Sequence, residues 1–373
     1  MRPRHVAIIG LLIPLAGAAL AAALVVRSMR GPAGAGSGAS GVPALIFAEY
    51  GPTADRVYSA PADDLARRTL VATIEHAEGW SITPASAMAG SLVAYTVLGP
   101  GAAARRDAPA ELWLLDVATG TQRRLARDAD LLVPPAFDQR GERVAYRSTN
   151  GDGEQRLVRV DLQRGAQRVL HRDADDFGVY PLGFDADGAL LFAALSTAGT
   201  DVFRLRDGEQ PQALLHASDE LARDWRISPD GRSLSYLAPQ LELERVVYRL
   251  HVVGIAGGDA QRLASLPGQQ LAPVWTPSGD AITVGRDAYP AASAAAVTLS
   301  LAGGAPRALP APERGFDAPL GWSPDGRYLA ARGFDGASAY APGREWLIVI
   351  ADGARRTLEG RSELIFIGWL ASG

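Results

Sequence analysis

The sequence predicts an all-β protein, a β-propeller of seven four-stranded blades, with six blades as the alternative. Two observations predict this fold: one turn segment recurs at a nearly constant spacing, and two short strand pairs accompany each copy. A third observation concerns the ends, where three N-terminal strands lack a fourth that the C-terminus can supply.

The recurring turn ends in Gly in all five copies; the Pro-Asp core before it is complete in two, is lost in the copies at 137 and 184, and has Ser278 in place of Asp in another. Its glycines are spaced 47, 43, 48 and 47 residues apart, and each glycine precedes a short apolar run. Pro pre-sets φ, Asp bonds its own backbone, and Gly supplies a positive φ, so each segment predicts a hairpin turn. The five copies are Phe137-Asp-Gln-Arg-Gly141, Phe184-Asp-Ala-Asp-Gly188, Ile227-Ser-Pro-Asp-Gly231, Trp275-Thr-Pro-Ser-Gly279 and Trp322-Ser-Pro-Asp-Gly326.

A second hairpin follows in every repeat. Leu112-Trp-Leu-Leu115 leads through Thr119-Gly120 to Gln122-Arg-Arg-Leu125, and Trp346-Leu-Ile-Val-Ile350 leads through Asp352-Gly353 to Arg355-Arg-Thr-Leu358. Each unit of about 47 residues therefore contains four short strands, the pattern of a propeller blade. Inner strands are expected near Ile82, Leu132, Leu182, Trp225, Val274, Leu320 and Ile367.

The two ends of the chain complement each other. Three apolar runs between Ala44 and Val71 have no preceding Gly turn, whereas Leu364-Ile-Phe-Ile-Gly-Trp369 has no following hairpin. We expect the last strand to be the innermost strand of the first blade, because this pairing removes two exposed sheet edges.

The segments Trp322-Ser-Pro-Asp-Gly-Arg-Tyr-Leu-Ala330 and Ile227-Ser-Pro-Asp-Gly-Arg-Ser-Leu-Ser235 resemble the WD40-like Pro-Asp repeat of the TolB-type propellers. The propellers of prolyl-oligopeptidase-like proteins carry a similar repeat. The resemblance covers residues 42–373 and implies partner binding, or a gating cap on a hydrolase. It is specific for fold and poor for function, since one fold hosts many activities.

Composition excludes several kinds of site. With 37 basic and 41 acidic residues the net charge is −4, so the chain lacks the basic balance of a nucleic-acid binder. Zero Cys excludes disulfides, Cys-ligated metals and a Cys nucleophile. No Gly-x-Ser-x-Gly motif occurs, and no room remains outside the ring for a hydrolase domain. We therefore expect neither an enzyme nor a cofactor, with Ca²⁺ as the one metal left open.

The N-terminus predicts a membrane segment. Val6 to Val26 is uncharged over 21 residues, about 31 Å of helix, which is enough to cross a bilayer. Residues 1–30 are thus read as an anchor or a signal sequence, 31–41 as a Gly/Ala/Ser tether and 42–373 as the propeller. A single-pass anchor with the propeller outside the cytoplasm is favoured, and a cleaved signal giving a secreted or periplasmic protein is the alternative.

Acidic residues recur between a fourth strand and the next inner strand, where propeller connections lead into the central channel. Such a ring of carboxylates could hold Ca²⁺ or a basic peptide. The alternative is a solvated loop surface with turn-forming Asp. The candidates are Asp130, Asp175, Asp176, Asp224, Asp317 and Glu363.

Long loops between second and third strands open on the same face. They span residues 99–110, 238–244, 286–294 and 333–344, and Tyr289 and Tyr340 lie within two of them. Because long loops are uncommon unless functional or disordered, we expect this face to bind a protein or peptide, with the two tyrosines as anchors. Tolerated Ala- and Pro-rich insertions are the simpler explanation.

The sequence therefore favours a membrane-tethered, extracytoplasmic, non-catalytic scaffold. The rival hypothesis is a propeller enzyme or a small-ligand or Ca²⁺ binder that uses the acidic channel mouth. A regulatory partner of a separately encoded hydrolase is a third hypothesis. Convergence of the carboxylates, with shifted pKa values, would favour the rival.

Overall fold

The computed structural model describes residues 41–82, 87–103, 105, 108–149, 154–173, 178–242, 244–263, 266–360 and 362–372. Over these residues the chain forms 29 β-strands and no α-helix. The described part accordingly holds no helix that is long and apolar enough to span a membrane. The predicted anchor at 6–26 lies outside it.

Four-stranded antiparallel units follow one another along the chain. The closing sheet contains the last strand and the first three: β29 (Leu364–Leu370), β1 (Ala44–Glu49), β2 (Ala54–Pro61) and β3 (Thr69–Glu75). The next unit contains β4 (Ala87–Ala89), β5 (Leu92–Val97), β6 (Ala110–Asp116) and β7 (Thr121–Ala129). It is followed by β8 (Ala136–Phe137), β9 (Arg143–Thr149), β10 (Gln155–Asp161) and β11 (Gln167–Asp173).

The second and third units form one eight-stranded sheet, in which β7 and β9 are joined by the single pair Ala129–Ser148. The next sheet holds β12 (Val179–Phe184), β13 (Leu190–Ser196), β14 (Gly199–Leu205) and β15 (Gln212–Ser218). The one after it holds β16 (Arg223–Ile227), β17 (Ser233–Glu242), β18 (Arg245–Gly254) and β19 (Gln261–Arg262).

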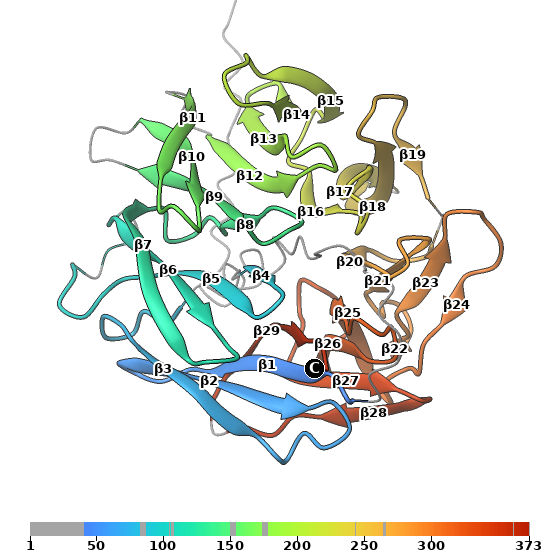
Figure 1. Cartoon of the computed structure of the whole chain (residues 1–373). Helices are drawn as coiled ribbons and strands as arrows, with labels where there is room; N and C mark the ends of the chain where they lie inside the picture. Colours follow the sequence, from blue (N-terminus) through green and yellow to red (C-terminus); the bar gives the residue numbers. More distant parts are fainter. Residues whose placement is uncertain are drawn as a thin grey trace, which may run out of the picture.

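Two further sheets complete the chain. One holds β20 (Gln270–Trp275), β21 (Ala281–Arg286), β23 (Val297–Ser300) and β24 (Arg307–Ala308). The other holds β25 (Gly315–Trp322), β26 (Leu329–Phe334), β27 (Glu345–Ala351) and β28 (Ala354–Thr357), with the short β22 (Ser293–Ala294) added in parallel to β25. Figure 1 shows the sheets arranged as a ring around a common centre.

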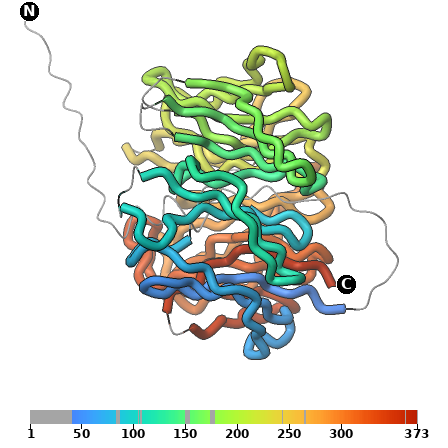
Figure 2. Tube along the Cα trace, turned by 60° about the vertical axis from the view of Figure 1, so that its left-hand side comes forward, coloured from blue at the N-terminus to red at the C-terminus, as the bar shows by residue number. Residues whose placement is uncertain are grey.

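The ring closes as the sequence predicts. β1 pairs with β29 in antiparallel register from Ala44–Leu370 to Glu49–Leu364. The first and last strands lie side by side in Figure 2, blue against red. Phe366 and Trp369 of β29 are buried against the β25–β28 sheet. The last strand therefore packs the closing sheet onto the β25–β28 sheet.

The core consists of apolar side chains packed between adjacent sheets. Leu182 and Leu191 of one sheet, for example, share a cluster with Trp225 and Tyr236 of the next. Side chains on both faces of the inner strands are buried because each sheet packs on a neighbour at both faces. Two inner strands begin later than expected: β4 starts at Ala87 rather than near Ile82, and β8 at Ala136 rather than near Leu132. The expected positions precede both strands instead of belonging to them.

The five repeat turns have the predicted geometry. All five repeat glycines lie in the left-handed region, with φ between +68° at Gly141 and +81° at Gly188. In the turn ending at Gly326, Ser323 Oγ accepts the backbone N–H of Tyr328 at 2.9 Å, which fixes the strand that follows.

We expect Gly326→Val to destabilise the protein by at least about 1 kcal/mol, because a β-branched residue is strained at positive φ. The position has φ +73°, and a Cβ added there would lie no nearer than 3.5 Å to any atom beyond its chain neighbours, so strain rather than collision sets the cost. Chemical denaturation measures it, with Ala302→Val in an exposed turn as the control. Equal midpoints for the two variants would mean that the backbone at Gly326 is not held in this conformation.

Candidate functional site

Four exposed apolar side chains gather where the loops of three consecutive sheets meet. They are Leu241 and Val246 at the tip of the β17–β18 hairpin, Tyr289 after β21, and Tyr340 between β26 and β27. Their exposed fractions are 75%, 51%, 54% and 72%. We call these four residues the docking patch. It includes both tyrosines that the sequence predicted as anchors.

Direct contacts join the three loops. The Tyr340 hydroxyl lies 3.5 Å from the Val246 carbonyl oxygen, to which it donates. The guanidinium of Arg245 lies 5.3 Å from the centre of the Tyr289 ring. The backbone N–H of Tyr289 donates to the carbonyl of Ala337 at 2.8 Å. The loops that carry Tyr289 and Tyr340 therefore lie against each other, and both contact the tip of the β17–β18 hairpin.

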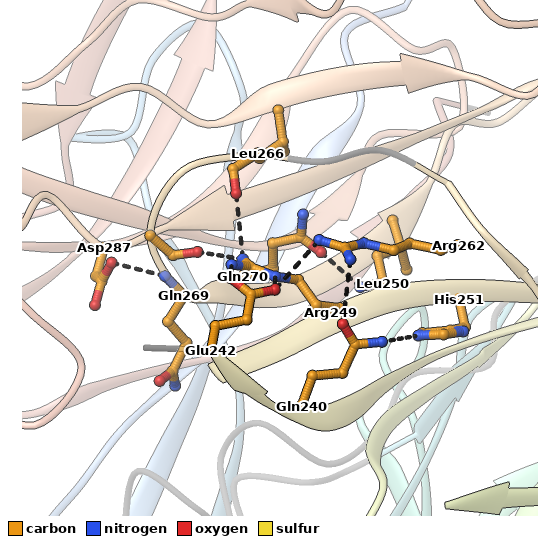
Figure 3. Close-up of polar contacts among 11 residues, drawn as sticks. Gln240, Glu242, Arg249, Leu250, His251, Arg262, Leu266, Gln269, Gln270 and Asp287 are labelled. Atoms are coloured by element: carbon orange, nitrogen blue, oxygen red, sulfur yellow. Dashed lines mark hydrogen bonds and ion pairs between the residues drawn. The ribbon is translucent and has the colours of Figure 1, made fainter. Parts of the chain in front are cut away.

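Arg249 fixes the hairpin that carries Leu241 and Val246 to the neighbouring chain. Arg249, only 4% exposed, forms an ion pair with Glu242 on the facing strand. Its Nη1 also donates to the carbonyls of Gly268 at 2.5 Å and Leu266 at 3.2 Å, which belong to the connection into β20. Figure 3 shows Arg249 at the centre of these contacts.

Two more bonds tie this region to the adjacent sheet. The Gln270 side chain accepts the backbone N–H of Leu250 at 2.5 Å, and Asp287 accepts that of Gln269 at 2.9 Å (Figure 3). Asp287 directly precedes the loop that carries Tyr289. A surface held in place before binding loses little side-chain and loop entropy on association, which favours affinity.

The predicted channel-mouth carboxylates lie on different sheets, and the structure gives each its own surroundings. The Asp130 carboxylate accepts a hydrogen bond from Arg147 Nη2 at 2.7 Å and another from the backbone N–H of Leu132 at 2.8 Å. Arg147 also stacks on the ring of Tyr180 and donates to the Val179 carbonyl. The Asp130 carboxylate thus positions an arginine that ties two sheets together.

Asp317 is fully buried, and its Oδ1 accepts a hydrogen bond from Arg355 Nη2 at 2.5 Å. Gly333 is paired with Asp317 in the sheet, and a Cβ there would lie 3.3 Å from Asp317 Oδ1, so the glycine leaves the room that the ion pair needs. Burial raises the pKa of Asp317, and the charge of Arg355 partly opposes that shift.

Asp224 is buried without a close partner. Its exposure is 0%, its φ is +58°, and neither carboxylate oxygen has a hydrogen-bond partner of ordinary geometry among the described residues. Arg223 Nε lies 3.8 Å away. Burial raises the pKa of Asp224 to about 6, and burial lowers the pKa of the neighbouring Arg226 to about 10.

Glu363 precedes β29 and is exposed, and its pKa is raised first by partial burial of its carboxylate and then by the negative charge of Glu345. Asp175 and Asp176 lie at 174–177, outside the described residues. Within the described ranges no group of three or more His, Asp or Glu side chains is placed to hold a metal ion.

The sequence reasoning missed Leu241 and Val246. The segment Leu241-Glu-Leu-Glu-Arg-Val-Val247 has the alternation of a strand pair, which could have shown that the hairpin continues outward past Pro239. It also missed His76, which is buried against Asp55 at 3.2 Å. Asp55 accepts the backbone N–H of Ile82 at 2.7 Å, so this pair holds the connection towards β4.

No protein-family model matches the chain, and no curated protein sequence matches it. Solved structures do. An oligogalacturonate lyase solved with manganese is 13% identical and has a TM-score of 0.53, over 84% of this chain and 84% of that one. The β-propeller domain of the Trilobed protease from Pyrococcus furiosus is 14% identical and has a TM-score of 0.50, over 74% of this chain and 82% of that one.

The chain is a β-propeller. TolB from Acinetobacter baumannii is also similar, at 15% identity and a TM-score of 0.46. The match covers 71% of this chain and 65% of the TolB chain. The propeller domain of the Trilobed protease confirms the resemblance drawn from the Pro-Asp repeats as a likeness of fold. The oligogalacturonate lyase shows that a chain of similar fold can be an enzyme, so the fold alone does not decide between binding and catalysis.

Proposed function

We propose that this propeller is a membrane-tethered, extracytoplasmic scaffold that binds a protein or peptide partner through the docking patch and catalyses no reaction. The single observation that carries the proposal is the meeting of loops from three sheets, which together carry four half- to three-quarters-exposed apolar side chains. Contiguous exposed apolar surface on a folded protein is typical of interaction sites, and Tyr is enriched among interface anchors.

The ring itself is proposed to have seven blades. Supporting this count, the eight-stranded sheet divides at one residue pair into two runs of four strands, and five other sheets remain. The tether is proposed from the uncharged stretch at 6–26 and the Gly-rich stretch that follows. Tethering would raise the effective concentration of the patch near membrane-bound partners.

The non-catalytic role is proposed because the described carboxylates stay separate. Asp130 and Asp317 each hold an arginine, and Asp224 is sealed from solvent. An active site at the channel mouth would need several such groups within reach of one substrate atom.

Photo-crosslinking in cells tests the proposal. With p-benzoylphenylalanine at position 340 we expect one recurrent protein adduct, because this position is 72% exposed within the docking patch. The same amino acid at position 169, on the outer strand β11 and 39% exposed, is the control. Identical adduct patterns from the two positions, or no adduct from position 340, would contradict the proposal.

The double variant Leu241→Ser/Val246→Ser should lower the yield of that adduct about tenfold or more, since each apolar side chain buried at an interface contributes about 1.5 kcal/mol or more. The melting temperature should not fall, because both side chains are exposed. Leu70→Ser, at a 51% exposed position on β3, is the matched control and should leave the adduct unchanged.

A further inference from the structure

Two arginine side chains are stacked on tyrosine rings beside the docking patch. The guanidinium carbon of Arg223, at the start of β16, lies 3.8 Å from the centre of the Tyr248 ring on β18. The guanidinium carbon of Arg245, which begins β18, lies 5.3 Å from the centre of the Tyr289 ring. Tyr248 follows Val246 by two residues on the same strand, so both arginines border the residues of the patch.

Tyr248 connects Arg223 to the loop that carries Tyr340. Burial is the first cause of the raised pKa of the Tyr248 hydroxyl. Among the charged and polar neighbours, Arg223 has the largest effect on that pKa, which it lowers, and Tyr340 follows. Tyr340 in turn donates to the carbonyl of Val246 at 3.5 Å. Arg223 therefore lies within electrostatic reach of the loop tips that meet at the patch.

The hydrogen-bond donors of both arginines are unused within the fold. Among the described residues, neither the Arg223 side chain nor the Arg245 side chain forms a hydrogen bond. The ion pair of Arg223 is with Asp224, whose Oδ2 lies 3.8 Å from Nε, beyond hydrogen-bond distance. A guanidinium carries five N–H donors, so a large unmet capacity for hydrogen bonds stands beside an apolar surface.

Stacked arginines elsewhere in the propeller do use their donors. Arg147, which lies over a tyrosine ring, donates to Asp130 at 2.7 Å. Arg124, which lies over a tryptophan ring, donates to Glu111 at 2.6 Å. In both places an acid of the chain itself takes the edge of the guanidinium. At Arg223 and Arg245 that hydrogen bond is missing.

The acids near the two arginines do not supply it. Asp224 is sealed from solvent, and Glu242 forms ion pairs with two other arginines. Glu220 and Glu244 are exposed, and among the described residues neither is paired with Arg223 or Arg245. The tyrosine ring covers one face of each guanidinium, which leaves the N–H edge for an acceptor from outside.

Taking the docking patch as the binding surface of the proposed function, we propose that the partner segment bound there is acidic as well as apolar. One of its carboxylates is held by Arg223, and Arg245 is a second cation beside it. A guanidinium fixed by stacking can bond a carboxylate in a fork, a contact that a neutral segment cannot make. Arg223 carries more of the effect because its side chain is only 19% exposed, so water and salt screen the contact less.

Fluorescence anisotropy on the full-length chain tests this with the peptides Leu-Glu-Phe-Glu-Leu and Leu-Gln-Phe-Gln-Leu. Both carry an uncharged dye at the N-terminus and an amide at the C-terminus, so they differ only in the carboxylates. We expect the Gln peptide to bind at least about tenfold more weakly, and binding of the Glu peptide to weaken as salt is raised.

Arg223→Gln should reduce the affinity for the Glu peptide by about tenfold or more and leave the affinity for the Gln peptide unchanged. A residue with a purely structural role would change both affinities alike. Arg245→Gln, at an exposed position, should reduce the affinity for the Glu peptide by about threefold.

Arg327→Gln is the matched control. Arg327 also stacks on a tyrosine, 5.4 Å from the centre of the Tyr328 ring. It lies in the turn between β25 and β26, at the end of β26 remote from the Tyr340 loop. The variant makes the same charge change and should bind both peptides as the parent does. Thermal melts verify that all variants fold.

Equal affinities for the two peptides, tighter binding of the Gln peptide, parental affinity in Arg223→Gln, or no binding of the Glu peptide at millimolar protein would overturn this inference. The cross-link from position 340 reports on the proposed function without any peptide. If the peptides do not discriminate while that adduct still forms, the partner is not acidic but the docking patch stands. If the adduct is absent as well, the proposed function fails with it.

Discussion

Removing residues 364–373 should unfold the propeller at ambient temperature. The deletion takes away β29, whose side chains Ile365, Phe366, Ile367 and Trp369 are at most 7% exposed. Burying four such side chains contributes on the order of 6–12 kcal/mol, which equals or exceeds much of the stability of a typical domain. It also leaves the inner edge of β1 without six residue pairs. Circular dichroism during heating measures the effect.

A graded series distinguishes loss of the strand from loss of the chain end. Removing only Ser372 and Gly373, beyond β29, should leave the melting temperature unchanged. Phe366→Ala should give an intermediate result, costing about 3–5 kcal/mol as large-to-small core substitutions do. If the chain ending at Glu363 melts at the temperature of the parent, the closing pairing does not hold the ring together.

Asp224→Asn should stabilise the protein at pH 8 by about 1–3 kcal/mol. Burial raises the pKa of Asp224 from 3.8 to about 6 in the folded state, so folding favours its protonated form. The stability that this proton provides is fully present below the unfolded pKa and is lost as the pH rises through about 6. Asparagine is neutral throughout, and it tolerates the left-handed backbone at this position as aspartate does.

The gain at pH 8 is smaller than the pKa shift alone would give, because the variant also removes the negative charge that partly offsets the burial of Arg226. Urea denaturation at pH 4 and pH 8 measures it, and the variant and the parent should differ little at pH 4. Asp259→Asn, at an exposed position between β18 and β19, is the control and should show no such trend. A difference that is the same at both pH values would show that Asp224 is not the titrating group.

The fold could be predicted because its signals are local. The turn glycines need positive φ whatever surrounds them, and the apolar runs beside them predict strand pairs; the structure confirms both at Gly231 and Gly326. The pairing of β1 with β29 followed from a missing strand at one end and a surplus strand at the other. The late starts of β4 and β8 could not be predicted. Leu132 belongs to a short apolar run that periodicity alone cannot assign, and Ile82 is a single apolar residue between Ser81 and Thr83.

The site was only half predictable for a different reason. Tyr289 and Tyr340 stood out because long loops and aromatic residues are visible in the sequence. That these loops meet the tip of the β17–β18 hairpin depends on strand length and register across three sheets, which the sequence does not specify locally. The partners of Asp130 and Asp317 depend on side chains that reach across strands, as Arg355 does over Gly333.

The closing pairing of β1 with β29 also bears on how the protein folds. The Ser362 hydroxyl donates to the Tyr50 carbonyl across 312 residues of chain, whereas most strand pairs form within one repeat. Local hairpins form in microseconds, but contacts of long sequence separation slow folding because chain entropy is lost before they are made. We therefore expect ring closure to be the slow kinetic step. Until it occurs, β1 presents an open edge that can pair with another chain, so refolding yield should fall with rising protein concentration.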